Sequence, residues 1–218
     1  MLRAVISNDG YVLCTLLSLS LVLVVKILNS KRMMDFLRFL GNSNYLRIYI
    51  KEHSFFDRFD SLLFFNFCLN GTAFGYIIYA AFVDQIEINI TTFLISFGLI
   101  AFWVLLKTGI QLLIGYVFDF YKYINILKFQ QISSLNFVGI MLLPMNAVLV
   151  FQLNFDASAV LLSGIILLTV IGFGMIKTIQ SNLKLVLSNF FYFILYICTL
   201  EFGPWILTYG LLGSNNSL

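Results

Sequence analysis

Two ionisable residues, Lys107 and Glu201, lie inside long apolar stretches of the chain, at 92–118 and 187–212. A charge in such a stretch is costly if the stretch crosses a membrane, so it is usually paired or functional. As helices rising about 1.5 Å per residue, the two stretches would place the two backbones roughly 5 Å apart in depth. Two long side chains can bridge that difference in depth if the two helices are neighbours. We therefore hypothesise an intramembrane ion pair between Lys107 and Glu201.

The role of this pair is open to three interpretations. It can be a clamp that fixes which helices pack together, because pairing relieves the cost of burying either charge alone. It can be a proton or ion relay, or part of a substrate path. Without a pair, Lys107 would extend toward the membrane surface and Glu201 would be protonated.

Amide side chains recur at helical spacing within the long apolar stretches of the chain. Gln111 follows Lys107 by four residues, and Asn66 and Asn70 share one face of 61–83. Asn136 and Asn146 share a face of 132–151. Such stripes are typical of helix–helix contacts in lipid, and a hydrated cavity is the alternative.

Two prolines interrupt apolar stretches, Pro144 and Pro204. Each removes a helical hydrogen bond and frees the carbonyl four residues earlier. For Pro204 that carbonyl belongs to Leu200, beside Glu201. A kink there could form a cation or proton site, as the broken helices of transporters do, or it could only bend the helix.

The elements that hold these residues follow from composition. The chain has 218 residues, of which 61% are hydrophobic and 11% charged, whereas soluble domains average about 25% charged. Crossing a membrane takes about 20 apolar residues as a helix, and continuous runs exclude the alternation of barrel strands. The sequence predicts an all-α, polytopic membrane bundle as a single domain over 1–218, with six transmembrane helices at 11–28, 61–83, 92–118, 132–151, 157–176 and 187–212.

The basic residues fix an orientation. Eleven of the 13 Lys and Arg residues fall on one side of the six-span arrangement, Arg3 falls on the other, and Lys107 lies within a span. Because cytoplasmic loops carry the excess of Lys and Arg, both termini are predicted to be periplasmic. The first span has no cleavage site after it, so we interpret it as a retained anchor.

The long cytoplasmic connection, 29–60, is predicted to begin with an interfacial amphipathic helix. Lys31 and Arg38 fall on one face, and apolar side chains fall on the other. It is either an elbow between two spans or a docking surface for a cytoplasmic partner or anionic lipid. The docking residues would be Lys31, Arg32, Arg38, Phe36, Leu37 and Leu40.

Motifs for catalysis are missing from the sequence. His53 is the single histidine, and the three cysteines lie in separate apolar runs without metal-ligand spacing. No phosphate-binding loop or nucleophile elbow occurs. We expect no enzyme activity, no cofactor and no metal. The net charge of +3, without a dense basic patch, argues against nucleic-acid binding.

The stretch Phe191-Tyr192-Phe193-Ile194-Leu195-Tyr196-Ile197-Cys198-Thr199-Leu200-Glu201-Phe202-Gly203-Pro204 resembles the C-terminal signature, with a Leu-Glu-x-x-Pro motif, of an uncharacterised multi-pass inner-membrane family of Bacteroidota. The stretch 137–144 and the Arg- and Phe-rich first loop are also similar to it. That family usually has small residues before the proline, where this chain has Phe202-Gly203. The resemblance implies residence in a bacterial inner membrane and places Glu201 and Pro204 in the motif. It implies no reaction.

The expected function is that of a non-enzymatic subunit or assembly factor of a larger cell-envelope complex, with secretion or gliding machinery as the candidates. Its partners would be the lipid bilayer and other membrane proteins of that complex. The alternative is a small proton- or ion-coupled transporter or channel that uses the Lys107–Glu201 pair.

Overall fold

The computed structural model describes residues 9–37, 57–83, 89–117 and 121–181. All regular structure in these ranges is helical, and five of the helices are long and apolar enough to cross a membrane. The predicted sixth span, 187–212, lies outside the described residues. The long helices are α1 (Asp9–Leu28), α4 (Arg58–Phe82), α5 (Ile90–Val117), α6 (Tyr121–Phe151) and α7 (Ala157–Ser181), and a short α2 (Ser30–Leu37) follows α1.

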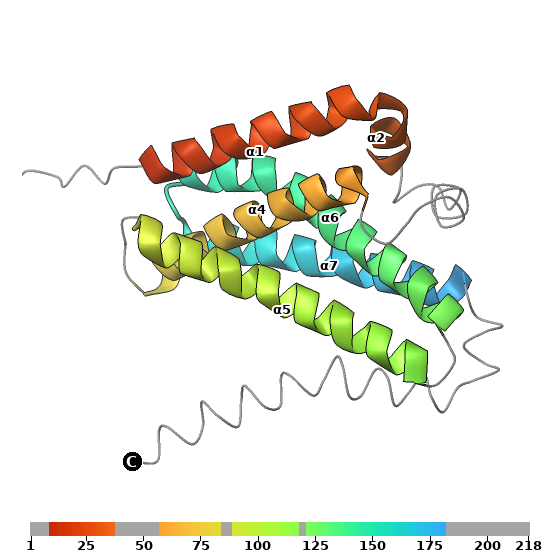
Figure 1. Cartoon of the computed structure of the whole chain (residues 1–218). Helices are drawn as coiled ribbons and strands as arrows, with labels where there is room; N and C mark the ends of the chain where they lie inside the picture. The colour runs from red at the N-terminus through yellow and green to blue at the C-terminus, as the bar shows by residue number, and fades with distance from the viewer. Residues whose placement is uncertain (1–8, 38–56, 84–88, 118–120, 182–218) are drawn as a thin grey trace, which may run out of the picture.

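The helices α4 and α6 form the centre of the bundle and contact each of the other long helices. They run in the same direction, and α1, α5 and α7 run the opposite way around them (Figure 1). This is the alternation expected when consecutive spans are joined by short connections across a membrane.

Two hydrogen bonds show that α4 and α6 keep a constant register. The Asn136 side-chain amide donates to the backbone carbonyl of Asp60 at 3.4 Å, and that of Asn146 donates to the carbonyl of Asn70 at 3.0 Å. Both bonds join residues 76 positions apart. The two helices therefore lie side by side, in parallel, from Asp60 to Asn70 along α4.

Between these bonds the two backbones approach closely at Gly139. A Cβ atom added there would lie 2.7 Å from the Cα atom of Phe67, which is closer than packed carbon atoms come. Small residues permit such approaches between helices in lipid. Gly139 thus sets the separation of the two central helices.

The helix α6 begins at Tyr121, well before the predicted start of the fourth span at 132. Its first turns carry polar residues, including Lys122, Asn125 and Lys128. The predicted span at 132–151 therefore lies within α6, and the helix extends further toward the N-terminus through these polar residues. What the sequence suggested as a connection between the third and fourth spans is mostly the first part of α6. Pro144 lies within α6, and the helix continues past it to Phe151.

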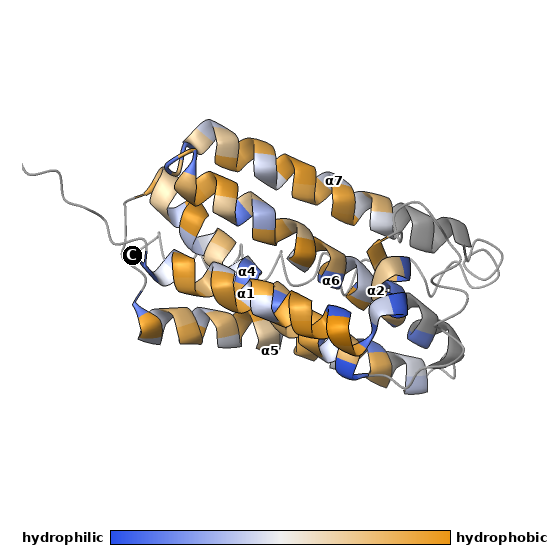
Figure 2. Ribbon diagram, turned by 90° about the horizontal axis from the view of Figure 1, so that it is seen from above, coloured by the Kyte–Doolittle hydropathy of each residue, from blue (hydrophilic) through white to orange (hydrophobic). Residues whose placement is uncertain are grey.

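Hydropathy along the bundle matches a membrane setting. Apolar residues fill the middle of the long helices, and hydrophilic residues lie toward the two ends of the bundle, one of which carries α2 (Figure 2). Many large apolar side chains on α1, α5 and α7 are exposed. A soluble protein would not leave so much apolar surface in contact with water.

Candidate functional site

A cluster of four polar side chains joins α1, α4 and α6 in the interior, made by Ser18, Asn66, Asn70 and Asn146. The Ser18 hydroxyl donates to Oδ1 of Asn66 at 2.6 Å, and Nδ2 of Asn70 donates to that hydroxyl at 2.6 Å. Nδ2 of Asn70 also lies 3.1 Å from Oδ1 of Asn66. Asn146 reaches the same turn of α4 through the Asn70 carbonyl.

We call these four residues the carboxamide cluster. Each of them is buried, and Ser18, Asn66 and Asn70 lie near the middle of α1 and α4. The cluster is uncharged, and its amides and hydroxyl neither gain nor lose protons near neutral pH. Its chemistry is therefore that of hydrogen-bonded attachment between spans.

A second polar group, which we call the arginine clamp, joins α2 to the start of α4. Arg32 of α2 donates from Nη1 to Asp57 and from Nη2 to Asp60, each at 2.7 Å. The side chains of Arg32 and Asp60 are 6% and 9% exposed, whereas that of Asp57 is 36% exposed. Arg32 and Asp60 thus form a buried ion pair, with Asp57 at its solvent edge.

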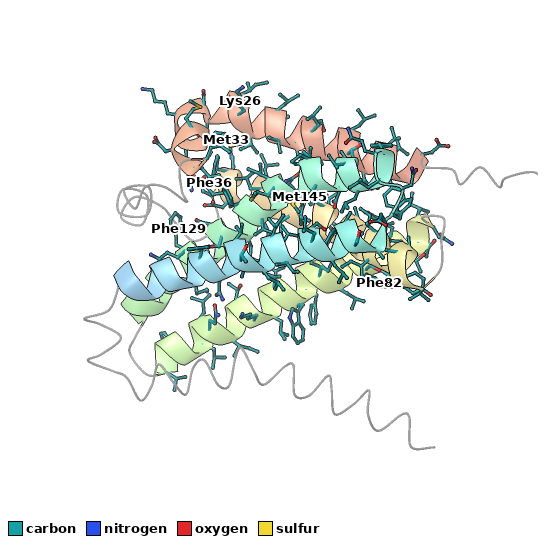
Figure 3. The ribbon with its side chains drawn as sticks, turned by 180° about the vertical axis from the view of Figure 1, so that it is seen from behind. Lys26, Met33, Phe36, Phe82, Phe129 and Met145 are labelled. Atoms are coloured by element: carbon teal, nitrogen blue, oxygen red, sulfur yellow. The ribbon has the colours of Figure 1, made fainter. Side chains whose placement is uncertain are left out.

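Aromatic side chains enclose the arginine clamp. The guanidinium carbon of Arg32 lies 4.4 Å from the centre of the Phe59 ring, close enough for a cation–π interaction. Phe36 of α2 packs edge-on against Phe59 and also contacts Phe137 of α6. Met33 and Phe36 lie on the side of α2 turned toward the bundle (Figure 3). The clamp and these rings hold α2 against both central helices.

A third contact joins α5 to α6 near the same end of the bundle. The Gln111 side chain is buried and donates from Nε2 to Oε1 of Gln131 at 3.0 Å. Lys107 lies one turn earlier on α5 and is half-buried. Glu201 and Pro204 lie outside the described residues, so the predicted ion pair with Lys107 stays a prediction.

The structure separates the residues of the predicted docking helix. Arg32 and Phe36 are buried, because one binds two carboxylates and the other packs against aromatic rings. They belong to the inner contact of α2 and not to an outer docking surface. Lys31 and Leu37 are exposed, and Arg38 and Leu40 lie outside the described residues.

Sequence reasoning missed the acidic half of the arginine clamp and the serine of the carboxamide cluster. Asp57 carries a usable signal, since an Asp before an apolar run is a helix N-cap. The structure shows it in that role, with its side chain accepting from the backbone N–H of Arg58 at 2.8 Å. Ser18 carries no such signal, because a lone serine in an apolar helix usually bonds its own backbone.

No group of three His, Cys, Asp or Glu side chains in the part of the chain that the structure describes gathers to hold an ion. The sites that the described residues do form are a neutral cluster, a buried ion pair and a glutamine contact.

Comparison with protein families assigns the chain to a family. Residues 11–212 match the domain of unknown function DUF4271. Because the match extends over nearly all of the 218 residues, the chain belongs to this family. No curated protein and no solved structure matches the chain.

Proposed function

We propose that this DUF4271 protein is a non-enzymatic membrane subunit or assembly factor, which binds another membrane protein through the outer face of α5. The proposal is supported by a contrast between two parts of the bundle. Polar contacts and close packing join the inner helices to one another, whereas the apolar side chains described on α5 are exposed or only partly buried. The carboxamide cluster, the arginine clamp and the close approach at Gly139 tie α1, α2, α4 and α6 together.

The helix α5 differs from the central helices in its burial. No apolar side chain described on α5 is buried, whereas α4 buries several, among them Leu63, Leu69 and Ile77. The exposed side chains of α5 include Phe102, Trp103 and Tyr116. Large aromatic side chains are enriched in protein interfaces, and α5 presents them on an apolar helix in the membrane.

Site-specific photo-crosslinking tests this proposal in the native membrane. A photoreactive amino acid at Leu99, Phe102 or Leu113 samples α5, and matched positions at Leu161, Ile165 and Leu168 sample the exposed apolar surface of α7. We expect crosslinks from α5 to a second protein, seen as a discrete increase in apparent mass, and lipid adducts alone from α7. A crosslink within the chain leaves the mass unchanged, so contact with the predicted sixth span is distinguishable from a partner.

Purification in mild detergent with a C-terminal tag gives an independent test. A stoichiometric partner that disappears when Phe102 and Trp103 are replaced by alanine supports the subunit role. A chain that purifies alone, yields no crosslinks from α5 and conducts ions in liposomes would overturn it.

That last outcome would favour the second candidate, a small transporter or channel. Its support is a half-buried lysine, Lys107, within α5 and a glutamate, Glu201, in the predicted sixth span. The variants K107E and E201K, and the double variant that exchanges the two charges, separate the roles. Recovery of function on exchange indicates a clamp, whereas normal assembly without function indicates a relay.

The finer location is also a proposal. We infer six spans with both termini periplasmic, in the inner membrane of a bacterium of the Bacteroidota, with a secretion or gliding complex as the setting. The distribution of basic residues supports the orientation. The Leu200-Glu201-x-x-Pro204 motif supports the lineage.

A further inference from the structure

The short helix α2 has three distinct faces. Its inner face carries Arg32, Met33 and Phe36, which pack against the bundle. At 100° per residue, the remaining side chains divide into an apolar face and a charged face. The exposed apolar face carries Met34 and Leu37, with Ser30 of the first turn between them, and the exposed charged face carries Lys31 and Asp35.

The apolar face of α2 adjoins exposed apolar residues at the end of α1. Ile27 is 81% exposed and Leu28 is 58% exposed, and only Asn29 separates the two helices. Met34 and Leu37 of α2 are about half exposed. The end of a membrane-spanning helix therefore passes directly into a second helix that also presents apolar side chains outward.

Basic side chains border this apolar surface. Lys26 lies in the last turn of α1 and projects from the outer side of the bundle (Figure 3). Lys31 is exposed in the first turn of α2. Asp35 is the acidic residue that α2 exposes, so the charge of Lys26, Lys31 and Asp35 together is net positive.

A fixed helix with an apolar face and a basic border fits the boundary between acyl chains and head groups. The arginine clamp determines which way α2 is turned, because Arg32 binds carboxylates at the start of α4. The apolar face then meets acyl chains while the lysines meet phosphate. Juxtamembrane Lys and Arg residues attract anionic lipids at the cytoplasmic surface.

We propose that α2 and the end of α1 form a binding surface for anionic phospholipid, with Lys26 and Lys31 contacting the head-group phosphate and Ile27, Met34 and Leu37 contacting the acyl chains. This surface is separate from the outer face of α5. It does not depend on whether the protein is a complex subunit or a transporter.

Lipid titration of the purified full chain tests the head-group contact. Native mass spectrometry in detergent gives an apparent Kd for phosphatidylglycerol and for phosphatidylcholine. We expect K26Q/K31Q to weaken phosphatidylglycerol binding about 30-fold, since each cation near an anionic head group contributes about fivefold. Phosphatidylcholine binding should weaken much less, because its choline cation cancels the charge of the phosphate. The variant K177Q/K184Q removes the same charge on the same predicted side and should change binding less than about threefold.

Three outcomes would overturn the proposal. The first is an equal loss in both double variants, which indicates a general charge effect. The second is displacement of the lipid by millimolar glycerol 3-phosphate, which indicates a site for free phosphate. The third is unchanged lipid binding in K26Q/K31Q together with loss of a co-purifying protein, which assigns the surface to a protein partner.

A second experiment tests the acyl-chain contact with neighbouring positions. A fluorophore is attached to Met34→Cys or to Asp35→Cys in a background where Cys14, Cys68 and Cys198 are replaced by alanine. In vesicles of phosphatidylcholine and phosphatidylglycerol, brominated lipid should quench the fluorophore at position 34 at least twice as strongly as at position 35. Aqueous iodide should show the reverse order. Equal quenching at both positions by iodide would place α2 in water and contradict the proposal.

Discussion

Arg32 attaches the short helix α2 to the start of α4. Its guanidinium binds one oxygen of each of two carboxylates and lies over the Phe59 ring, and the Asp60 carboxylate is nearly as buried as Arg32 itself. A buried pair of this kind contributes little compared with an apolar pair of the same shape, but the loss of one partner leaves an isolated charge. The two aspartates of the clamp therefore respond differently to substitution.

The variant R32M should lower the free energy of unfolding by about 3 kcal/mol, because it leaves the Asp60 carboxylate buried without its cation. The double variant R32M/D60N should recover most of that loss. Asp57→Asn, at the more exposed position, should cost less than about 1 kcal/mol. Unfolding in mixed micelles of mild detergent and dodecyl sulfate measures these values. Wild-type stability of R32M would contradict the buried ion pair.

Asp156 stands at the other end of the bundle, where it caps α7. Its carboxylate accepts from the Ser158 hydroxyl and from the backbone N–H of Ala159, the latter at 3.1 Å. These hydrogen bonds, that from Ser158 first, hold the pKa of Asp156 below its ordinary value of 3.8. A lowered pKa in the folded state means that the stabilisation is present above pH 3.8 and is lost as the pH falls through the lower folded pKa.

Asp156→Asn isolates this contribution, because an asparagine oxygen still caps the helix but does not titrate. We expect the difference in unfolding temperature between the wild type and D156N to be constant above about pH 5. Below about pH 4 the wild type should lose stability relative to D156N. A scan of thermal unfolding from acidic to neutral pH in detergent measures this, and parallel curves over the whole range would exclude the effect.

At the scale of the helices, the pair α4 and α6 organises the bundle through one glycine and two amide bonds. Gly139 lies between the bonds from Asn136 and Asn146, so that close approach and hydrogen bonding act along one seam. In lipid there is little hydrophobic drive between helices, so close packing and polar contacts decide which helices pair.

Gly139→Ala should destabilise the bundle by about 1–3 kcal/mol, because its methyl group would meet the backbone of Phe67. Gly164→Ala in α7 is the matched control, since a Cβ atom there meets no other atom within 4 Å. The control should unfold at the wild-type temperature or slightly above it, as alanine favours helix. Thermal unfolding in detergent compares the two, and equal midpoints would show that the α4–α6 seam is loose.

The five long apolar helices that the structure describes could be predicted from the sequence, because continuous apolar runs of about 20 residues are typical of membrane-crossing helices. The true start of α6 could not, since helix continues through polar residues that hydropathy excludes. Spacing placed Asn66 and Asn70 on one face, but not their partner Ser18 on another helix. Asp60 falls in the predicted loop, because the predicted span begins at 61. Its pairing with Arg32 could not be predicted, because it depends on how α2 packs against α4. The spacing of residues in a sequence predicts which side chains share a face of one helix. It does not predict contacts between two helices, such as those of Ser18 with Asn70 and of Arg32 with Asp60.

At the scale of the whole molecule, the helix directions and the positions of the basic residues both distinguish the α2 end of the bundle from the opposite end. The helices α4 and α6 are parallel, and the α2 end carries the arginine clamp, the buried Lys128 and the exposed lysines Lys26 and Lys31. The α6–α7 turn, which contains Asp156, lies at the opposite end (Figure 1). If the α2 end is cytoplasmic, α7 returns the chain to the cytoplasm, and the location of the C-terminus depends on 187–212.

Reporter fusions decide whether 187–212 crosses the membrane. Green fluorescent protein is fluorescent when it folds in the bacterial cytoplasm, whereas alkaline phosphatase is active only after export, where its disulfides form. We expect a fusion after Ser181 to be fluorescent and to lack phosphatase activity. A fusion after Leu218 should show the opposite pair of signals.

The two fusion sites control for one another, because they differ only in the presence of the predicted sixth span. Cytoplasmic signals at both sites would mean that 187–212 does not cross, and Glu201 would then not be an intramembrane residue. Export at both sites would reverse the orientation and place the arginine clamp outside the cytoplasm. The expected pair of signals would mean that 187–212 crosses the membrane, so that Glu201 lies within it, as Lys107 of α5 is predicted to. The charge-exchange experiment on Lys107 and Glu201 requires this arrangement.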